Sequence, residues 1–66
     1  MKVIANGTPI DLPAGSTLTD LLQAIGLGAR WVVAEHNGEA VPRWEMAEIA
    51  LADGDRIELV RAVAGG

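Results

Sequence analysis

The last four residues, Val63-Ala64-Gly65-Gly66, are where this sequence could do chemistry. A terminal carboxylate on a small, unbranched chain end can be threaded into the active site of another protein and activated there. Glycine has no Cβ, so Gly65 and Gly66 would fit a narrow channel and adopt backbone angles closed to other residues. Paired glycines also arise by chance at frayed termini. The ending therefore suggests a reactive handle, and the rest of the chain has to support it.

No other group of residues forms a catalytic or metal site. Glu35 and His36 are neighbours in a predicted strand and should point to opposite faces, with His36 exposed or at a sheet edge. The acidic residues Asp53, Asp55 and Glu58 lack the ligand spacing of a calcium loop. The chain has no cysteine and one histidine, which excludes thiolate and histidine-rich metal sites. We therefore expect a protein that is not itself an enzyme and that binds no metal or cofactor.

Composition points to a small acidic domain. The chain has 66 residues and a net charge of −4, which argues against nucleic-acid binding. An acidic body would be attracted to a basic groove on a partner protein, although mild acidity can also serve only solubility. The sequence has no apolar run of the roughly 20 residues that a membrane span needs, and its start lacks the features of a secretory signal. We expect a cytoplasmic protein without a membrane contact.

The first half of the chain predicts a hairpin followed by a helix. Alternation in 1–6 and the dipeptide Asn6-Gly7 predict a strand and a tight turn, with a returning strand at 8–12. Either Ser16 or Thr17 could cap the helix, and Thr17 with Asp20 forms an acidic capping-box variant. One apolar stripe follows, formed by Leu18, Leu21, Leu22 and Ile25. So short a helix must pack on a sheet to be stable.

The second half predicts further strands joined by tight turns. In order, we expect a strand region at 31–37, a turn at Asn37-Gly38, a short strand at 39–41, one helical turn at 43–48, a turn at 53–55 and a final strand at 56–63. In the final strand, Ile57, Leu59 and Val63 should face the core. Trp31 and Trp44 are expected in the core or covering an edge.

This order of elements predicts an α+β fold of the β-grasp, ubiquitin-like type. A mixed sheet of four to five strands would carry one main helix on one face, and the last strand would lie centrally and parallel to the first. Residues 1–63 would form the β-grasp domain, and residues 64–66 a flexible C-terminal carrier tail.

Several segments carry a resemblance to a known family. They are Met1–Gly7, Gly15–Leu18, Asn37–Arg43 and, most densely, Leu51–Gly66. Over essentially its whole length the chain resembles the sulfur carrier proteins of thiamine biosynthesis, the ThiS-like proteins. One departure is visible: the family often has Trp three residues after the arginine of its Pro-Arg pair, where this chain has Met46, and Trp44 lies one residue after that arginine. Methionine is a flexible core filler, so we expect only the local packing to differ.

The resemblance implies a mechanism. An E1-like adenylating enzyme would use ATP to adenylate the Gly66 carboxylate. Sulfur from a desulfurase or a rhodanese-type protein would then replace AMP and leave a thiocarboxylate, which would donate its sulfur to thiazole synthase. A thiocarboxylate is ionised at neutral pH. Its anionic sulfur is nucleophilic, just as a thiolate is a better nucleophile than a thiol.

Delivery of the tail also needs a docking surface. The tail, Ala64, Gly65 and Gly66, reaches about 10 Å beyond a strand that ends at Val63. Predicted contacts with the partner are three apolar residues on the face away from the helix, and an arginine beside the tail: Ile4, Val60, Ala62 and Arg61. Scattered exposed apolar residues are also normal on any protein.

Two other functions stay open at this point. One is the related carrier that donates sulfur for molybdopterin synthesis, although those carriers are usually longer and contain several Phe, of which this chain has none. The other is a ubiquitin-like binding module without carrier chemistry, for which the tail would be dispensable.

Overall fold

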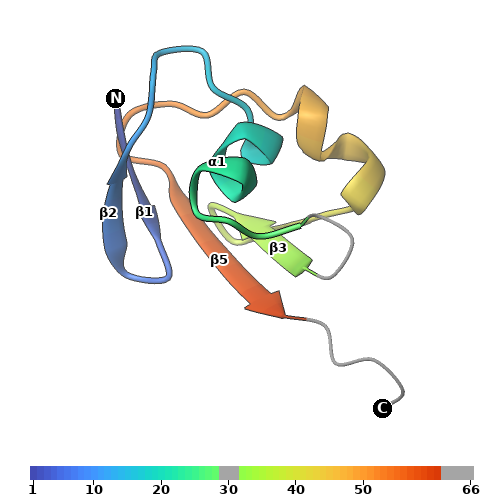
Figure 1. The fold of residues 1–66 in the computed structure, drawn as a ribbon. Helices are drawn as coiled ribbons and strands as arrows, with labels where there is room; N and C mark the ends of the chain where they lie inside the picture. The colour runs from blue at the N-terminus through green and yellow to red at the C-terminus, as the bar shows by residue number, and fades with distance from the viewer. Residues whose placement is uncertain (29–31, 62–66) are drawn as a thin grey trace.

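A computed structural model describes residues 1–28 and 32–61 of the chain. Within these two ranges, five strands and two short helical segments follow one another (Figure 1). In order they are β1 (Lys2–Ala5), β2 (Thr8–Asp11), α1 (Leu18–Ala24), β3 (Val32–His36), β4 (Glu39–Val41), η2 (Arg43–Glu48) and β5 (Arg56–Arg61). No helix in these two ranges is long and apolar enough to cross a membrane.

Both predicted Asn-Gly turns are present. Asn6 and Gly7 have φ values of 49° and 80°, and Asn37 and Gly38 have φ values of 50° and 88°. Two successive positive φ values give the backbone the twist that a tight hairpin needs, and asparagine and glycine tolerate them best. The turns therefore close the hairpins β1–β2 and β3–β4 as the sequence predicted.

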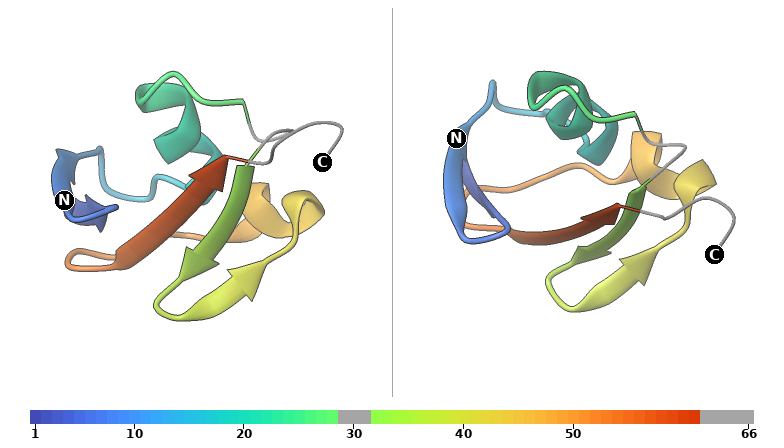
Figure 2. Two further views of the ribbon diagram at one scale, coloured as in Figure 1. Left: turned by 90° about the horizontal axis from the view of Figure 1, so that it is seen from below. Right: turned by 60° about the horizontal axis from the view of Figure 1, so that its bottom comes forward.

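The strands form one mixed sheet in the order β2-β1-β5-β3-β4. The final strand, β5, lies in the centre, parallel to β1 and antiparallel to β3. Figure 2 shows α1 across one face of this sheet, while no described element covers the other face. The predicted mixed sheet with a central last strand is confirmed. We call the uncovered side the open face.

A capping box fixes the start of α1. Thr17 is the N-cap: its Oγ1 accepts a hydrogen bond from the Asp20 N–H at 3.2 Å, and Asp20 Oδ2 accepts one from the Thr17 N–H at 2.8 Å. The alternative cap, Ser16, is buried and donates to the carbonyl of Pro13 instead. Gly26, with φ 78°, lies just past the helix end. The reciprocal bonds satisfy backbone groups that the first helical turn leaves unpaired.

The core lies between α1 and the covered face of the sheet. Leu18, Leu21 and Leu22 of the predicted stripe are buried, and Ile25 is half-buried. From the sheet the core receives Val3, Ala5, Val32, Ala34, Ile57 and Leu59, with Leu12, Val41, Met46 and Leu51 closing its edges. Of the residues predicted to face the core from the last strand, Val63 lies outside the described residues.

Met46 and Trp44, the two residues that depart from the family pattern, both lie in η2 but differ in burial. Met46 is 1% exposed and acts as the predicted core filler, whereas Trp44 is 78% exposed. The prediction that Trp44 lies in the core or covers an edge is therefore wrong. A 3-10 helix has three residues per turn, so residues two apart cannot both face inward, and η2 packs Met46 toward the core. Trp31 lies outside the described residues.

Candidate functional site

The central strand β5 leads toward the predicted tail. Its last residue, Arg61, is also the last that the structure describes; Ala62 and the tail residues Ala64, Gly65 and Gly66 lie beyond it. From Ile57 to its end β5 is paired with β3, with Arg61 opposite Val32 and Ile57 opposite His36. The body of the protein therefore holds the strand that precedes the tail in a fixed position.

The predicted contact residues that the structure describes do not lie together at one place on one face. Ile4 is half-buried and Val60 is 64% exposed. Ile4 pairs with Arg56, four residues before Val60, so about 13 Å of strand separates the two positions. Arg61 lies opposite the buried Val32, which places it by alternation on the other side of the sheet from Val60.

The direct neighbour of Val60 is a residue that sequence reasoning missed. Val33 of β3 lies opposite Val60 in the antiparallel register, and it is 56% exposed. The alternation of buried Val32 and Ala34 around Val33 could have indicated that it faces outward. The pairing of Val33 with Val60 depends on the register between two strands far apart in sequence. The structure thus adds an exposed apolar pair on the open face, next to the end of β5.

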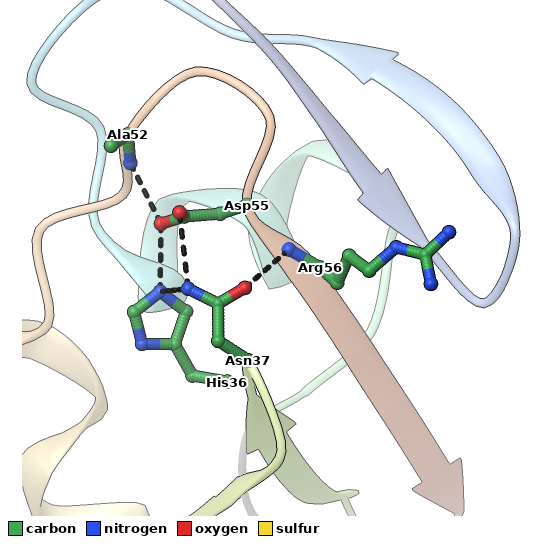
Figure 3. Close-up of polar contacts among 5 residues, drawn as sticks. All are labelled: His36, Asn37, Ala52, Asp55 and Arg56. Carbon is green, nitrogen blue, oxygen red and sulfur yellow. Dashed lines mark hydrogen bonds and ion pairs between the residues drawn. The ribbon is translucent and has the colours of Figure 1, made fainter.

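A polar cluster holds the opposite end of β5 (Figure 3). Asp55 Oδ2 accepts hydrogen bonds from His36 Nε2 at 2.7 Å and from the Ala52 N–H at 2.8 Å, and its Oδ1 accepts one from Asn37 Nδ2 at 3.2 Å. The Asn37 Oδ1 in turn accepts from the Arg56 N–H at 2.8 Å. The cluster ties the β3–β4 turn to the turn that starts β5.

The hydrogen bonds change the acidity of Asp55. Burial raises the pKa of its carboxyl, but the hydrogen bonds from His36, Ala52 and Asn37 outweigh burial, so the pKa is lowered from its ordinary value. His36 was expected to be exposed or at a sheet edge. Instead it lies at the end of an internal strand, and 23% of its side chain is exposed, because the Asp55 carboxylate holds it. These groups position turns, and they lie at the far end of β5 from the predicted tail.

Within residues 1–28 and 32–61, no group of three or more His, Cys, Asp and Glu side chains could hold a metal ion. Asp53, which the sequence places in the same turn as Asp55, accepts a hydrogen bond from the Lys2 N–H through Oδ1 at 2.7 Å. Asp53 and Asp55 thus accept hydrogen bonds from backbone N–H groups, Asp53 from the first strand and Asp55 from its own turn.

A mixed five-stranded sheet that wraps one helix, with the last strand in its centre, is the β-grasp fold of ubiquitin-like proteins. The crystal structure of the thiamine biosynthesis protein ThiS from Geobacter metallireducens has this fold and superposes with a TM-score of 0.83. It is 30% identical in sequence, and the alignment covers 100% of both chains. The fold class predicted from the sequence is confirmed.

The family follows from sequence comparison. The ThiS family model matches residues 3–66. The sulfur carrier protein ThiS of Escherichia coli is 30% identical over 66 residues, which are 100% of both chains. The chain belongs to the ThiS family, as its sequence resemblance indicated. A thiazole synthase of Paramagnetospirillum magneticum is 38% identical over the same 66 residues, and the chain spans 20% of the length of that relative.

Proposed function

We propose that this protein is a sulfur carrier in the formation of the thiazole of thiamine, and that the Gly66 carboxylate carries the sulfur. The main support is its membership of the ThiS family, whose Escherichia coli relative is a sulfur carrier protein that aligns over its full length. The family match extends through Gly66, so the paired glycines belong to the matched region.

The proposed chemistry has two steps on the terminal carboxyl group. An E1-like adenylating enzyme uses ATP: a Gly66 carboxylate oxygen attacks the α-phosphate, and pyrophosphate leaves. A persulfide sulfur on a desulfurase or a rhodanese-type protein then attacks the carbonyl carbon and displaces AMP, and a thiol reductant cleaves the resulting acyl disulfide to give the thiocarboxylate and a disulfide. The carboxylate needs the adenylate because it is a poor electrophile by itself.

The carrier contributes a scaffold to this chemistry, and the catalytic groups and the ATP site belong to its partners. Its one histidine is engaged with Asp55 in a cluster that holds turns. The body, 1–63, presents the tail, 64–66, from the end of the central strand. In this proposal Ile4, Val60, Arg61 and Ala62 contribute to partner contacts, the carrier binds no cofactor, and the reactions take place in the cytoplasm.

Thiazole synthase is the proposed acceptor of the sulfur. A thiazole synthase contains a segment that is 38% identical to this whole chain, which would keep a carrier beside the enzyme that it serves. Such an arrangement raises the effective concentration of a donor at its acceptor. A carrier on a separate chain needs a docking surface to achieve the same.

Intact-mass analysis tests the proposal. With the adenylating enzyme, ATP and a sulfur source, the mass of the chain should rise by the exchange of one oxygen for one sulfur. A variant that lacks Gly66 should keep its circular dichroism spectrum and show no mass gain, and a variant with one bulky residue after Gly66 should behave in the same way. A mass gain in either variant, or none in the wild type, would contradict the proposal.

The acceptor is tested by single turnover of the thiocarboxylated chain. Purified thiazole synthase should restore the carboxylate mass when its other substrates are present. Loss of sulfur only to a molybdopterin-forming enzyme would support the alternative pathway. Binding to the adenylating enzyme without any mass change would support a ubiquitin-like module without carrier chemistry.

A further inference from the structure

Two glutamates lie directly opposite each other on the open face of the sheet. Glu35 of β3 pairs with Glu58 of β5 in the antiparallel register, and both side chains are exposed. Residues two apart on a strand share a face, so this acidic pair lies beside the exposed pair Val33 and Val60. We call these four residues the acidic-apolar patch.

The acidic pair is unfavourable in the isolated protein. Like charges directly opposite one another destabilise a sheet. Arg56 is the next residue on the same face of β5, yet among the described residues neither glutamate has an ion pair within 4.0 Å. The other two residues of the patch leave apolar side chains in water, with 56% of Val33 and 64% of Val60 exposed. A partner surface that covered the patch would relieve the repulsion between the glutamates and remove the valine side chains from water.

A suitable surface would bring a basic side chain between the two carboxylates and apolar side chains onto the valines. Charge-assisted hydrogen bonds from Lys or Arg to a carboxylate are among the stronger ones available at an interface. A second copy of this chain does not fit, because a copy packed through the same face would bring two more glutamates and another net charge of −4. The occupant is therefore a different protein with a basic, partly apolar surface.

The patch lies at the end of β5 from which the chain continues toward Gly66. Val60 immediately precedes Arg61, the last residue of that strand. Gly66 is the sixth residue after Val60, and six residues correspond to a reach of about 20 Å. A protein docked on the patch would thus lie within reach of the Gly66 carboxyl group.

From the charge, the exposure and the position, we propose that the acidic-apolar patch docks thiazole synthase through a lysine or arginine that inserts between Glu35 and Glu58. This inference rests on the proposed function and adds the chemistry of the contact. It assigns Val33, Glu35 and Glu58, none of which the sequence had suggested as contact residues.

The test compares two charge-matched double variants of the full chain. Titration with purified thiazole synthase at low and at high salt should show that Glu35→Gln/Glu58→Gln weakens binding on the order of tenfold at low salt and reduces the salt dependence. The control, Glu45→Gln/Glu48→Gln, removes the same charge from exposed positions on η2 and should change binding less than about twofold. The first variant should also melt at an equal or higher temperature than the wild type, because a repulsion is removed.

The outcomes separate this inference from the proposed function. Equal weakening by both double variants would mean that only net charge matters and would overturn the docking proposal. Wild-type binding by Glu35→Gln/Glu58→Gln would overturn it too, while thiocarboxylate formation would leave the carrier function standing. Weakening toward the adenylating enzyme alone would show that the patch serves another partner and would likewise overturn it. Absence of binding by the wild type would overturn both the docking proposal and the delivery of sulfur to thiazole synthase.

Discussion

The side chain of Asn6 hydrogen-bonds both backbone groups of Leu59. Its Nδ2 donates to the Leu59 carbonyl at 3.0 Å, and its Oδ1 accepts from the Leu59 N–H at 2.7 Å. The backbone pairing of this segment with β5 ends where Ala5 lies opposite Ile57 and the Asn6 N–H donates to the Ile57 carbonyl at 2.9 Å. Asn6 therefore extends the pairing of the central strand by one position with its side chain. Because β5 leads to the tail, this contact fixes the strand from which the tail emerges.

Replacement of this asparagine should destabilise the fold. Asn6→Ala would leave two backbone groups of Leu59 without partners and place alanine at a φ of 49°. We expect the free energy of unfolding to fall by about 2 to 3 kcal/mol, measured by urea denaturation.

A glycine at the same position separates the two causes. Asn6→Gly removes the hydrogen bonds but accepts the positive φ, so the loss should be smaller, about 1 to 2 kcal/mol. If Asn6→Gly were as stable as the wild type, the two bonds to Leu59 would contribute nothing and the asparagine would be present only for its backbone conformation.

The Asp55 cluster predicts a loss of stability in acid. The hydrogen bonds that outweigh burial lower the pKa of Asp55 in the folded state, so the ionised form stabilises the fold at and above the unfolded pKa, about 4. This contribution should disappear as the pH falls through the lower, folded-state pKa. Thermal melts of the wild type between neutral pH and pH below 3 should show the decline.

The variant Asp55→Asn isolates this group from the other carboxylates. At neutral pH it should be less stable than the wild type by about 1 to 3 kcal/mol, since bonds from His36 and Asn37 to a charged acceptor are lost. The difference should shrink in acid, where the wild-type carboxyl is also protonated. A difference that stays constant over the whole pH range would assign the effect to packing.

The parts of the fold that could be predicted depend on neighbours in sequence. The two Asn-Gly turns and the bonds between Thr17 and Asp20 involve residues at most three apart, so local chemistry decides them. The alternation in the last strand also identified buried Ile57 and Leu59, because the period of a strand is a property of the strand itself.

The parts that could not be predicted depend on registers and distant partners. His36 and Asp55 are 19 residues apart, and no local sequence pattern predicts their contact. The pairing of Val33 with Val60 likewise needs the register of β3 on β5, and a shift by one residue would have turned Val33 inward. The exposed pair on the open face was therefore the least predictable part of the candidate site, whereas the tail stays a prediction because it lies outside the described residues.

The contrast between Met46 and Trp44 in η2 can be measured. Met46→Ala should lower the free energy of unfolding by about 2 to 4 kcal/mol, because it opens a cavity beside α1 at a residue only 1% exposed. Met46→Leu keeps most of the volume and should lose less than about 1.5 kcal/mol. Both values come from denaturant titration.

The exposed tryptophan provides the matched control in the same element. Trp44→Ala should change stability by no more than about 0.5 kcal/mol, since 78% of Trp44 is in water. A loss as large as that of Met46→Ala would mean that Trp44 packs into the body in solution.

The exposed valine pair should matter for binding and little for folding. Val33→Thr/Val60→Thr keeps the branched shape that strands favour and exchanges one methyl for a hydroxyl on each residue, both of which are more than half exposed. We expect a change in unfolding free energy within about 1 kcal/mol. If thiazole synthase covers the pair, its dissociation constant should rise about tenfold, because two methyl groups no longer leave water on binding.

Isothermal titration gives the dissociation constants, and Val33→Ile/Val60→Ile is the control that keeps the apolar surface. Equal binding by the threonine and isoleucine variants would show that the pair stays in water in the complex, and the contact would then have to lie elsewhere on the sheet.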